Sequence, residues 1–288
     1  MKNTFKQIGK ALLYFGVYLG GQFAASIAIS IALSIYAGFT CAREGIKDMS
    51  VIMERHQELY LHSTGLIVFG GALIAFITLL IVAAVRKAKM SEMTDAKKVS
   101  PKTLIAGYGI GLTCWFIINS ALLLLPIPQS VFDSYGNAAS GLMNQNIIFA
   151  ILGNIIAAPI IEEIIFRGLV FGRLKKGMPV WLALILSSLL FGLCHVNPLW
   201  ISYAAVLGMV FAFIYHKTGS ILPGIMAHMA CNLTSTALSY SGISVNTTFI
   251  YIGSIVMITI CAVCIFLYLK KHNSEKKAVV SVIPVNAA

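Results

Sequence analysis

The sequence predicts an all-α fold, a polytopic transmembrane helix bundle of about eight spans. Two observations carry this prediction. Hydrophobic residues make up 58% of the 288 residues and charged residues only 11%, and the mean hydropathy is +0.87. These values lie far from those of soluble domains. In lipid, backbone polar groups must be satisfied within helices or closed barrels, and long uncharged runs favour helices over alternating strands.

Eight apolar runs are long enough to be candidates for crossing a hydrocarbon core roughly 30 Å thick, which takes about 20 helical residues. They cover about residues 11–36, 66–85, 103–125, 146–171, 180–196, 199–215, 220–238 and 249–269. The fifth and sixth are short and are separated only by the sequence VNPLW, which predicts a tight hairpin near the far surface. The first run is too long for a signal peptide and is interpreted as an uncleaved anchor.

Basic residues predict the orientation of the spans, because lysine and arginine accumulate in cytoplasmic loops. They stand before the first span and after the second, fourth, sixth and eighth: Lys2, Lys6, Lys10; Arg86, Lys87, Lys89, Lys97, Lys98, Lys102; Arg173, Lys175, Lys176; Lys217; Lys270, Lys271, Lys276, Lys277. The intervening loops 37–65, 126–145 and 239–248 carry little basic excess. Both termini are therefore predicted to be cytoplasmic. This asymmetry explains the net charge of +11, so no nucleic-acid partner is needed.

Glycines and cysteines are expected to serve packing. The glycine pairs at 20–21 and 70–71 and the sequence GYGIG at 107–111 are typical of close helix contacts, not of phosphate-binding loops. The six cysteines are scattered mostly through the spans, and the CxxC formed by Cys261 and Cys264 lies in an apolar run without the context of a redox domain.

The charged residues within the spans are Glu162, Glu163 and Arg167. An ionisable residue at the bilayer centre costs at least about 2.5 to 3.5 kcal/mol, so three in one helix need an explanation. Glu163 and Arg167 are four residues apart and share a helix face, whereas Glu162 is turned about 100° away. A structural ion pair that holds helices together is the simpler interpretation. Pro159, just upstream, removes a backbone donor.

Histidines also occur in later spans. His195 follows Phe191 by one turn, and His228 precedes Asn232 by one turn. A single intramembrane histidine is more often a packing residue than a catalyst. At 1.5 Å per residue, however, these groups and Glu162 reach similar depths and can converge. The remaining histidines are interpreted as surface residues: His56, His62, His216 and His272.

Such a cluster predicts attack of water on a carbonyl. Glu162 with His195 can activate a water molecule, because a positioned carboxylate or imidazole accepts its proton. His228 and Asn232 can donate N–H groups to the oxyanion of a tetrahedral intermediate. Together they predict hydrolysis of a peptide bond within or next to the membrane.

The chain resembles the CAAX prenyl protease and bacteriocin-processing (Abi) intramembrane proteases. Their pattern is EExxxR, FxxxH and HxxxN on successive helices, and this chain reads EEIIFR from Glu162, FGLCH to His195 and HMACN from His228. The resemblance implies that Glu162 is the catalytic glutamate and that His195 helps to activate water. It also implies that His228 and Asn232 form the oxyanion hole, and that Glu163 and Arg167 support the site.

The resemblance covers residues 146–240 and divides the chain. We expect three N-terminal spans within 1–145, the catalytic core in 146–240, a last transmembrane helix in 241–272 and a disordered cytoplasmic tail in 273–288. The expected partners are membrane lipid and a membrane-associated or lipidated peptide, in peptide maturation or immunity. The expected location is a bacterial plasma membrane. Prenylated substrates are not assumed.

Three alternatives remain at this stage. Glu162, His195 and His228 are a ligand set that catalytic zinc accepts, although no HExxH is present, and we favour a metal-free glutamic mechanism without a cofactor. The scaffold can instead serve as a non-catalytic immunity or regulatory membrane protein. Intramembrane Glu and His also build proton-coupled transporters, but no inverted repeat is evident.

Overall fold

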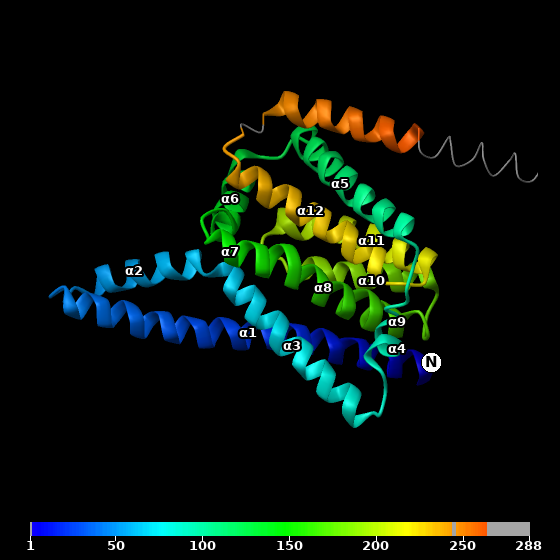
Figure 1. The fold of residues 1–288 in the computed structure, drawn as a ribbon, viewed down its shortest axis with the longest axis horizontal. Helices are drawn as coiled ribbons and strands as arrows, with labels where there is room; N and C mark the ends of the chain where they lie inside the picture. Colours follow the sequence, from blue (N-terminus) through cyan, green and yellow to red (C-terminus); the bar gives the residue numbers. More distant parts are fainter. Residues whose placement is uncertain (1, 244–245, 264–288) are drawn as a thin grey trace, which may run out of the picture.

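The computed structural model describes residues 2–243 and 246–263, and helices are the regular elements found there, without strands (Figure 1). Five helices are long and apolar enough to cross a membrane: α1 (Lys2–Arg43), α3 (Thr64–Val85), α5 (Pro101–Leu124), the helix Ile147–Leu174 and α11 (Pro198–Thr218). The prediction of an all-α membrane helix bundle is confirmed.

The other three predicted spans are also helices, but they are shorter or less apolar. They are α10 (Val180–Leu193), α12 (Leu222–Tyr240) and the helix Thr247–Val263. The 14 residues of α10 reach about 21 Å, which is less than the roughly 30 Å of a hydrocarbon core. A count of eight spans therefore stays a prediction. The predicted tail and the second cysteine of the CxxC lie outside the described residues.

Two of the predicted loops, 37–65 and 126–145, are largely helical, which corrects the prediction. In the first, α1 continues to Arg43 before Gly45 turns the chain at φ 76°, and α2 (Met49–His62) then packs back along α1. Asp48 caps α2 by accepting a hydrogen bond from Ser50 N. The second contains α6 (Gln129–Met143). These helices are too polar or too short to be detected as spans.

The helix Ile147–Leu174 lies at the centre of the bundle. It consists of α7 (Ile147–Phe149), the π-helical stretch η1 (Ala150–Ala157), α8 (Ala158–Glu162), a second π-helical stretch η2 (Glu163–Phe171) and α9 (Gly172–Leu174). Figure 1 shows α1 and α3 on one side of it and α12 with α5 on the other. Every residue from 161 to 172 is buried, so this half of the helix is enclosed by protein.

The expected close helix contacts are present. Gly107 and Gly111 of α5 lie directly against the backbone of α12, at Pro223 and Ala227. Gly21 of α1 meets α3 in the same way, where a Cβ would lie 2.7 Å from Gly71 O. Small residues let membrane helices approach closely where lipid gives no hydrophobic driving force. The α5 contact holds α12, which carries His228, against the bundle.

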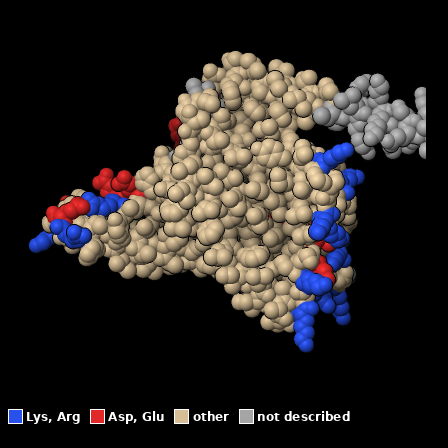
Figure 2. Space-filling model, in the orientation of Figure 1, with Lys and Arg blue, Asp and Glu red and all other residues tan. Residues whose placement is uncertain are grey.

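Charged side chains gather at two ends of the molecule (Figure 2). Lysines and arginines form one group beside the N-terminus, and a smaller group of mixed charge marks the tip formed by α1 and α2. In the mixed group, Arg55 and Glu44 form an ion pair of 2.8 Å. The visible surface between these ends is almost free of charge, as expected of the face that contacts lipid.

The α5 contact leads to a first prediction, about Gly111→Ala. A Cβ at Gly111 would collide with Ala227 O, so α5 has to move away from α12. We expect a loss of about 1 to 3 kcal/mol in the free energy of unfolding, which is typical of overpacking. Denaturation in mixed micelles measures it. Gly109→Ala is the matched control, because nothing lies within 4 Å of its Cβ position. Equal stability of the two variants would contradict the packing described here.

Candidate active site

Glu162 ends α8 and is 7% exposed. Tyr18 of α1 donates a hydrogen bond of 2.7 Å from its hydroxyl to Glu162 Oε1. The other carboxylate oxygen, Oε2, lies 3.6 Å from His228 Nε2 on α12. Glu162 is therefore held between α1 and α12, with one oxygen bound and the other facing an imidazole.

Glu163 begins η2 and forms the ion pair that its spacing predicts. Its Oε1 lies 2.9 Å from Arg167 Nη1, and both side chains are almost completely buried, with exposures of 0% and 1%. The guanidinium also donates a hydrogen bond of 3.1 Å to Gly208 O of α11. It stacks over the ring of Phe191, 4.4 Å from the centroid, and lies 5.3 Å from that of Phe211. Arg167 thus connects η2 with α10 and α11.

His228 contacts both glutamates. Its Nδ1 lies 3.2 Å from Glu163 Oε1, while Nε2 faces Glu162. An ionised carboxylate only accepts hydrogen bonds, so the tautomer with its proton on Nδ1 suits this contact. Phe211 stacks on the ring with centroids 5.1 Å apart, and Phe191 meets it edge-on at 5.7 Å. Glu163 and two phenylalanines therefore fix the direction in which Nε2 points.

His195 lies just beyond the end of α10, half-buried beside the site. Its Nδ1 is 3.2 Å from Phe191 O, and its ring packs against Phe191 at 5.2 Å and Trp200 at 5.1 Å. Among the described residues it forms no hydrogen bond or ion pair with Glu162. The imidazole that approaches Glu162 within 4 Å is that of His228, and the ring of Phe191 contacts both histidines.

Asn232 follows His228 by one turn of α12. Its Nδ2 donates a hydrogen bond of 2.8 Å to Asn154 O of η1, which uses one of its two N–H groups. The second N–H remains for another acceptor. The structure thus brings together Glu162, Glu163, Arg167 and His228, and places His195 and Asn232 at the edges of this group.

The alternative zinc site would use Glu162, His195 and His228 as ligands. Within residues 2–243 and 246–263, no three His, Cys, Asp or Glu side chains are grouped so that they could hold a metal ion. Glu162 Oε2 and His228 Nε2 lie 3.6 Å apart, and the contact given for His195 Nδ1 is with Phe191 O. Catalytic zinc takes three protein ligands, so the choice between a glutamic and a zinc-dependent mechanism stays a prediction.

A cavity of about 230 Å³ lies at the basic end, lined in part by Arg173, Lys175 and Asp95. None of the candidate active-site residues lines this cavity.

Asp95, at the edge of the cavity, has a pKa below its usual value. Burial alone would raise this pKa, but hydrogen bonds from Tyr215 and Lys97 outweigh the effect of burial. Tyr215 donates a hydrogen bond of 2.5 Å to Asp95 Oδ2, so this segment ties the loop after α4 (Met90–Thr94) to α11.

Sequence reasoning did not find Tyr18. The only signal was a tyrosine hydroxyl in an otherwise apolar run, four residues after Tyr14 and so on the same face of α1. A buried tyrosine hydroxyl usually has a hydrogen-bond partner, but the sequence does not say which helix supplies it.

Comparison with known proteins shows similarity to membrane peptidases. Residues 144–234 match a family described as Rce1-like, type II CAAX prenyl endopeptidase Rce1-like. The chain is 30% identical over 226 residues to the putative membrane peptidase YdiL of Bacillus subtilis (strain 168), which covers 75% of this chain and 83% of that protein. It is 24% identical over 151 residues to CAAX prenyl protease 2 of Arabidopsis thaliana, which covers 45% of each chain. No solved structure matches the chain.

The matched region contains the three motifs, and similarity to YdiL extends over three quarters of the chain. Helical architecture, apolar spans and the similarity to a membrane peptidase point to the same conclusion. This chain belongs to the Rce1-like family of CAAX prenyl endopeptidases.

Proposed function

We propose that the protein is an intramembrane endopeptidase that hydrolyses a peptide bond of a membrane-associated or lipidated peptide. The observation that carries the proposal is the approach of Glu162 Oε2 to His228 Nε2, 3.6 Å apart and both buried. This separation is longer than a hydrogen bond. One water molecule can still lie within hydrogen-bond distance of both atoms, at the apex of a triangle.

In the proposed reaction, Glu162 is the general base. Tyr18 occupies Oε1, so Oε2 is the oxygen that accepts a proton from water. The resulting hydroxide attacks the carbonyl carbon and forms a tetrahedral intermediate. Glu162 then returns the proton to the leaving nitrogen, which breaks the C–N bond and restores the carboxylate. His195, half-buried beside the site, is proposed to assist in positioning the water.

His228 and Asn232 are proposed to stabilise the oxyanion. His228 can donate from both ring nitrogens only when it carries both protons, one directed at Glu163 and one at the oxyanion. In that form the two carboxylates, Arg167 and His228 are together electrically neutral, which lowers the cost of burying them. Asn232 contributes the N–H that Asn154 leaves free.

The proposed substrate is apolar, since the site lies among predominantly apolar helices of a membrane protein. The names of the relatives support peptide hydrolysis, since one is called a putative membrane peptidase and the other a CAAX prenyl protease. For this chain we propose the broader class of membrane-associated peptides, with maturation or immunity as the setting.

The two adjacent glutamates are predicted not to be interchangeable. Glu162→Gln removes the base, and we expect cleavage to fall by roughly 10²- to 10⁴-fold with the fold intact. Glu163→Gln leaves Arg167 as an uncompensated buried charge, and we expect a loss of about 3 to 5 kcal/mol in the free energy of unfolding. Comparison of membrane peptidomes from cells with each variant measures cleavage, and denaturation in micelles measures stability.

Glu58→Gln is the control, because Glu58 lies on α2 with 71% of its side chain exposed and should change neither quantity. Retention of cleavage and of the cellular phenotype by Glu162→Gln would support a non-catalytic protein. Substrate-dependent proton flux in proteoliposomes would instead support a transporter.

Metal dependence gives a third prediction. If Glu162 acts without a metal, the purified protein keeps its activity toward a peptide from the peptidome comparison after thorough chelation. Mass spectrometry of the metal content should then find no stoichiometric zinc. Loss of cleavage on chelation, with recovery on adding zinc alone, would favour the metalloprotease.

Orientation gives a fourth prediction, with both termini and the basic end in the cytoplasm. Single cysteines replace Lys98, in the loop before α5, and Met49, at the start of α2, in a background without the native cysteines. In intact bacterial cells, we expect an impermeant maleimide to label Met49→Cys at once and Lys98→Cys only after the membrane is permeabilised. The reverse labelling pattern would show that the protein has the opposite orientation in the membrane.

A further inference from the structure

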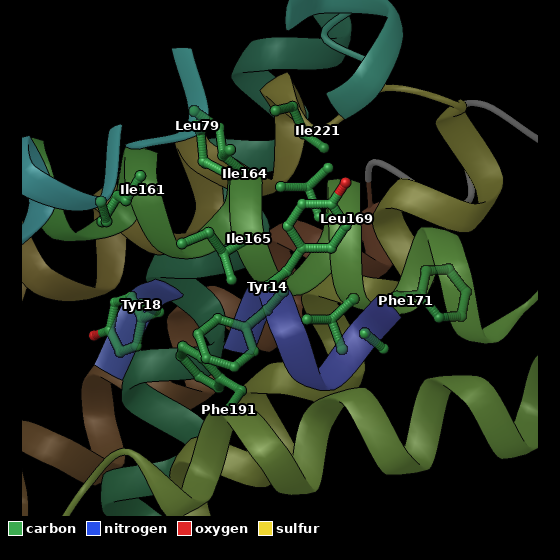
Figure 3. Packing of buried hydrophobic residues seen from close by; sticks show 14 of the residues in the cluster. Tyr14, Tyr18, Leu79, Ile161, Ile164, Ile165, Leu169, Phe171, Phe191 and Ile221 are labelled. Atoms are coloured by element: carbon green, nitrogen blue, oxygen red, sulfur yellow. The ribbon is translucent and has the colours of Figure 1, made fainter. Parts of the chain in front are cut away.

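Tyr18 reaches the catalytic glutamate from the first helix. Its hydroxyl donates a hydrogen bond of 2.7 Å to Glu162 Oε1, although 144 residues separate the two. The side chain is 6% exposed. Figure 3 shows Tyr14 and Tyr18 of α1 close to the isoleucines of the central helix. The contact therefore lies inside the packed core, where it is shielded from solvent.

The ring of Tyr18 is fixed independently of its hydroxyl. It packs edge-on against Phe166 of η2 with centroids 5.4 Å apart, and Phe166 packs in turn against Phe191 at 5.3 Å. Because aromatic packing already sets the ring, the hydroxyl points in a defined direction. Removing the oxygen alone leaves these ring contacts in place.

The hydrogen bond has a consequence for the chemistry at Glu162. A carboxylate has two equivalent oxygens and can rotate about its last side-chain torsion, which is broad. With Oε1 bound to Tyr18, Oε2 is directed toward His228 Nε2. Without that bond, the carboxylate can turn away from the water that Oε2 and Nε2 are proposed to share.

We propose that Tyr18 is a positioning residue of the active site, which selects Oε2 of Glu162 as the oxygen that receives the proton from water. This inference rests on the proposed role of Glu162 as the base. It makes α1 part of the active site, although α1 lies outside residues 144–234 that match the family. The first helix then does more than anchor the chain in the membrane.

The test compares Tyr18→Phe with Tyr14→Phe in the purified full-length protein, with a fluorogenic peptide based on the cleaved sequence from the peptidome comparison. Tyr14 is the matched control because it lies one turn earlier on the same face of α1 and is also buried, with 2% exposed. Its hydroxyl accepts a hydrogen bond of 2.6 Å from Arg86, so Tyr14→Phe also removes one buried hydrogen bond. We expect kcat of Tyr18→Phe to fall by roughly 10- to 100-fold, as for a lost hydrogen bond to a charged group. We expect KM to stay within about twofold, since Tyr18 is not proposed to touch the substrate.

Peptide binding separates positioning from a general structural defect. The affinity of the uncleaved peptide for Glu162→Gln should equal its affinity for the double variant Tyr18→Phe/Glu162→Gln. The proposal is overturned if Tyr18→Phe has the wild-type kcat, if the loss lies in KM or in peptide affinity, or if Tyr14→Phe is equally impaired. An active Glu162→Gln would refute the proposed function itself. An inactive Glu162→Gln together with a fully active Tyr18→Phe would refute only the role of Tyr18.

Discussion

The buried ion pair between Arg167 and Glu163 is the interaction on which the rest of the site depends. A charged group in the bilayer interior is costly unless it is paired and hydrogen-bonded. Here the guanidinium has a carboxylate at 2.9 Å, a backbone carbonyl at 3.1 Å and an aromatic ring at 4.4 Å. These partners come from η2, α11 and α10, so compensation of one charge fixes three helices around it.

The same pair determines the position of the histidine. Glu163 Oε1 contacts both Arg167 and His228 Nδ1. The arginine therefore holds the carboxylate in the place where it binds the histidine of α12. Phe211 and Phe191 line both the guanidinium and the imidazole. The residues that neutralise the buried charge are therefore also those that point His228 Nε2 toward Glu162. Stability and geometry are coupled at this point of the structure.

The side-chain contacts that follow from helix periodicity could be predicted from the sequence. The spacing of Glu163 and Arg167 predicts their pairing, and the turn of about 100° between neighbours predicts that Glu162 has other contacts. Both relations are present. The motifs on α10 and α12 likewise predict convergence of their histidines near the central helix. His228 contacts both glutamates of the central helix, and the ring of Phe191 contacts both imidazoles.

Relations between helices distant in sequence could not be predicted. Periodicity places Tyr18 on a face of α1 but does not say that this face meets Glu162, because packing order depends on all helices at once. The length of α1 and the helical nature of α2 were also missed. Their polar residues lower the hydropathy, while the turn at Gly45 follows the end of α1 and capping by Asp48 sets the start of α2.

One core joins the N-terminal helices to the motif-bearing region. A single hydrophobic cluster contains Tyr14 and Tyr18 of α1, Leu79 of α3, and Ile165 and Phe166 of η2. The boundary after residue 145 therefore separates two parts of the sequence, but both parts contribute to this one hydrophobic cluster. Because the central helix is enclosed from 161 to 172, its ionisable groups depend on α1 for part of their shielding from lipid.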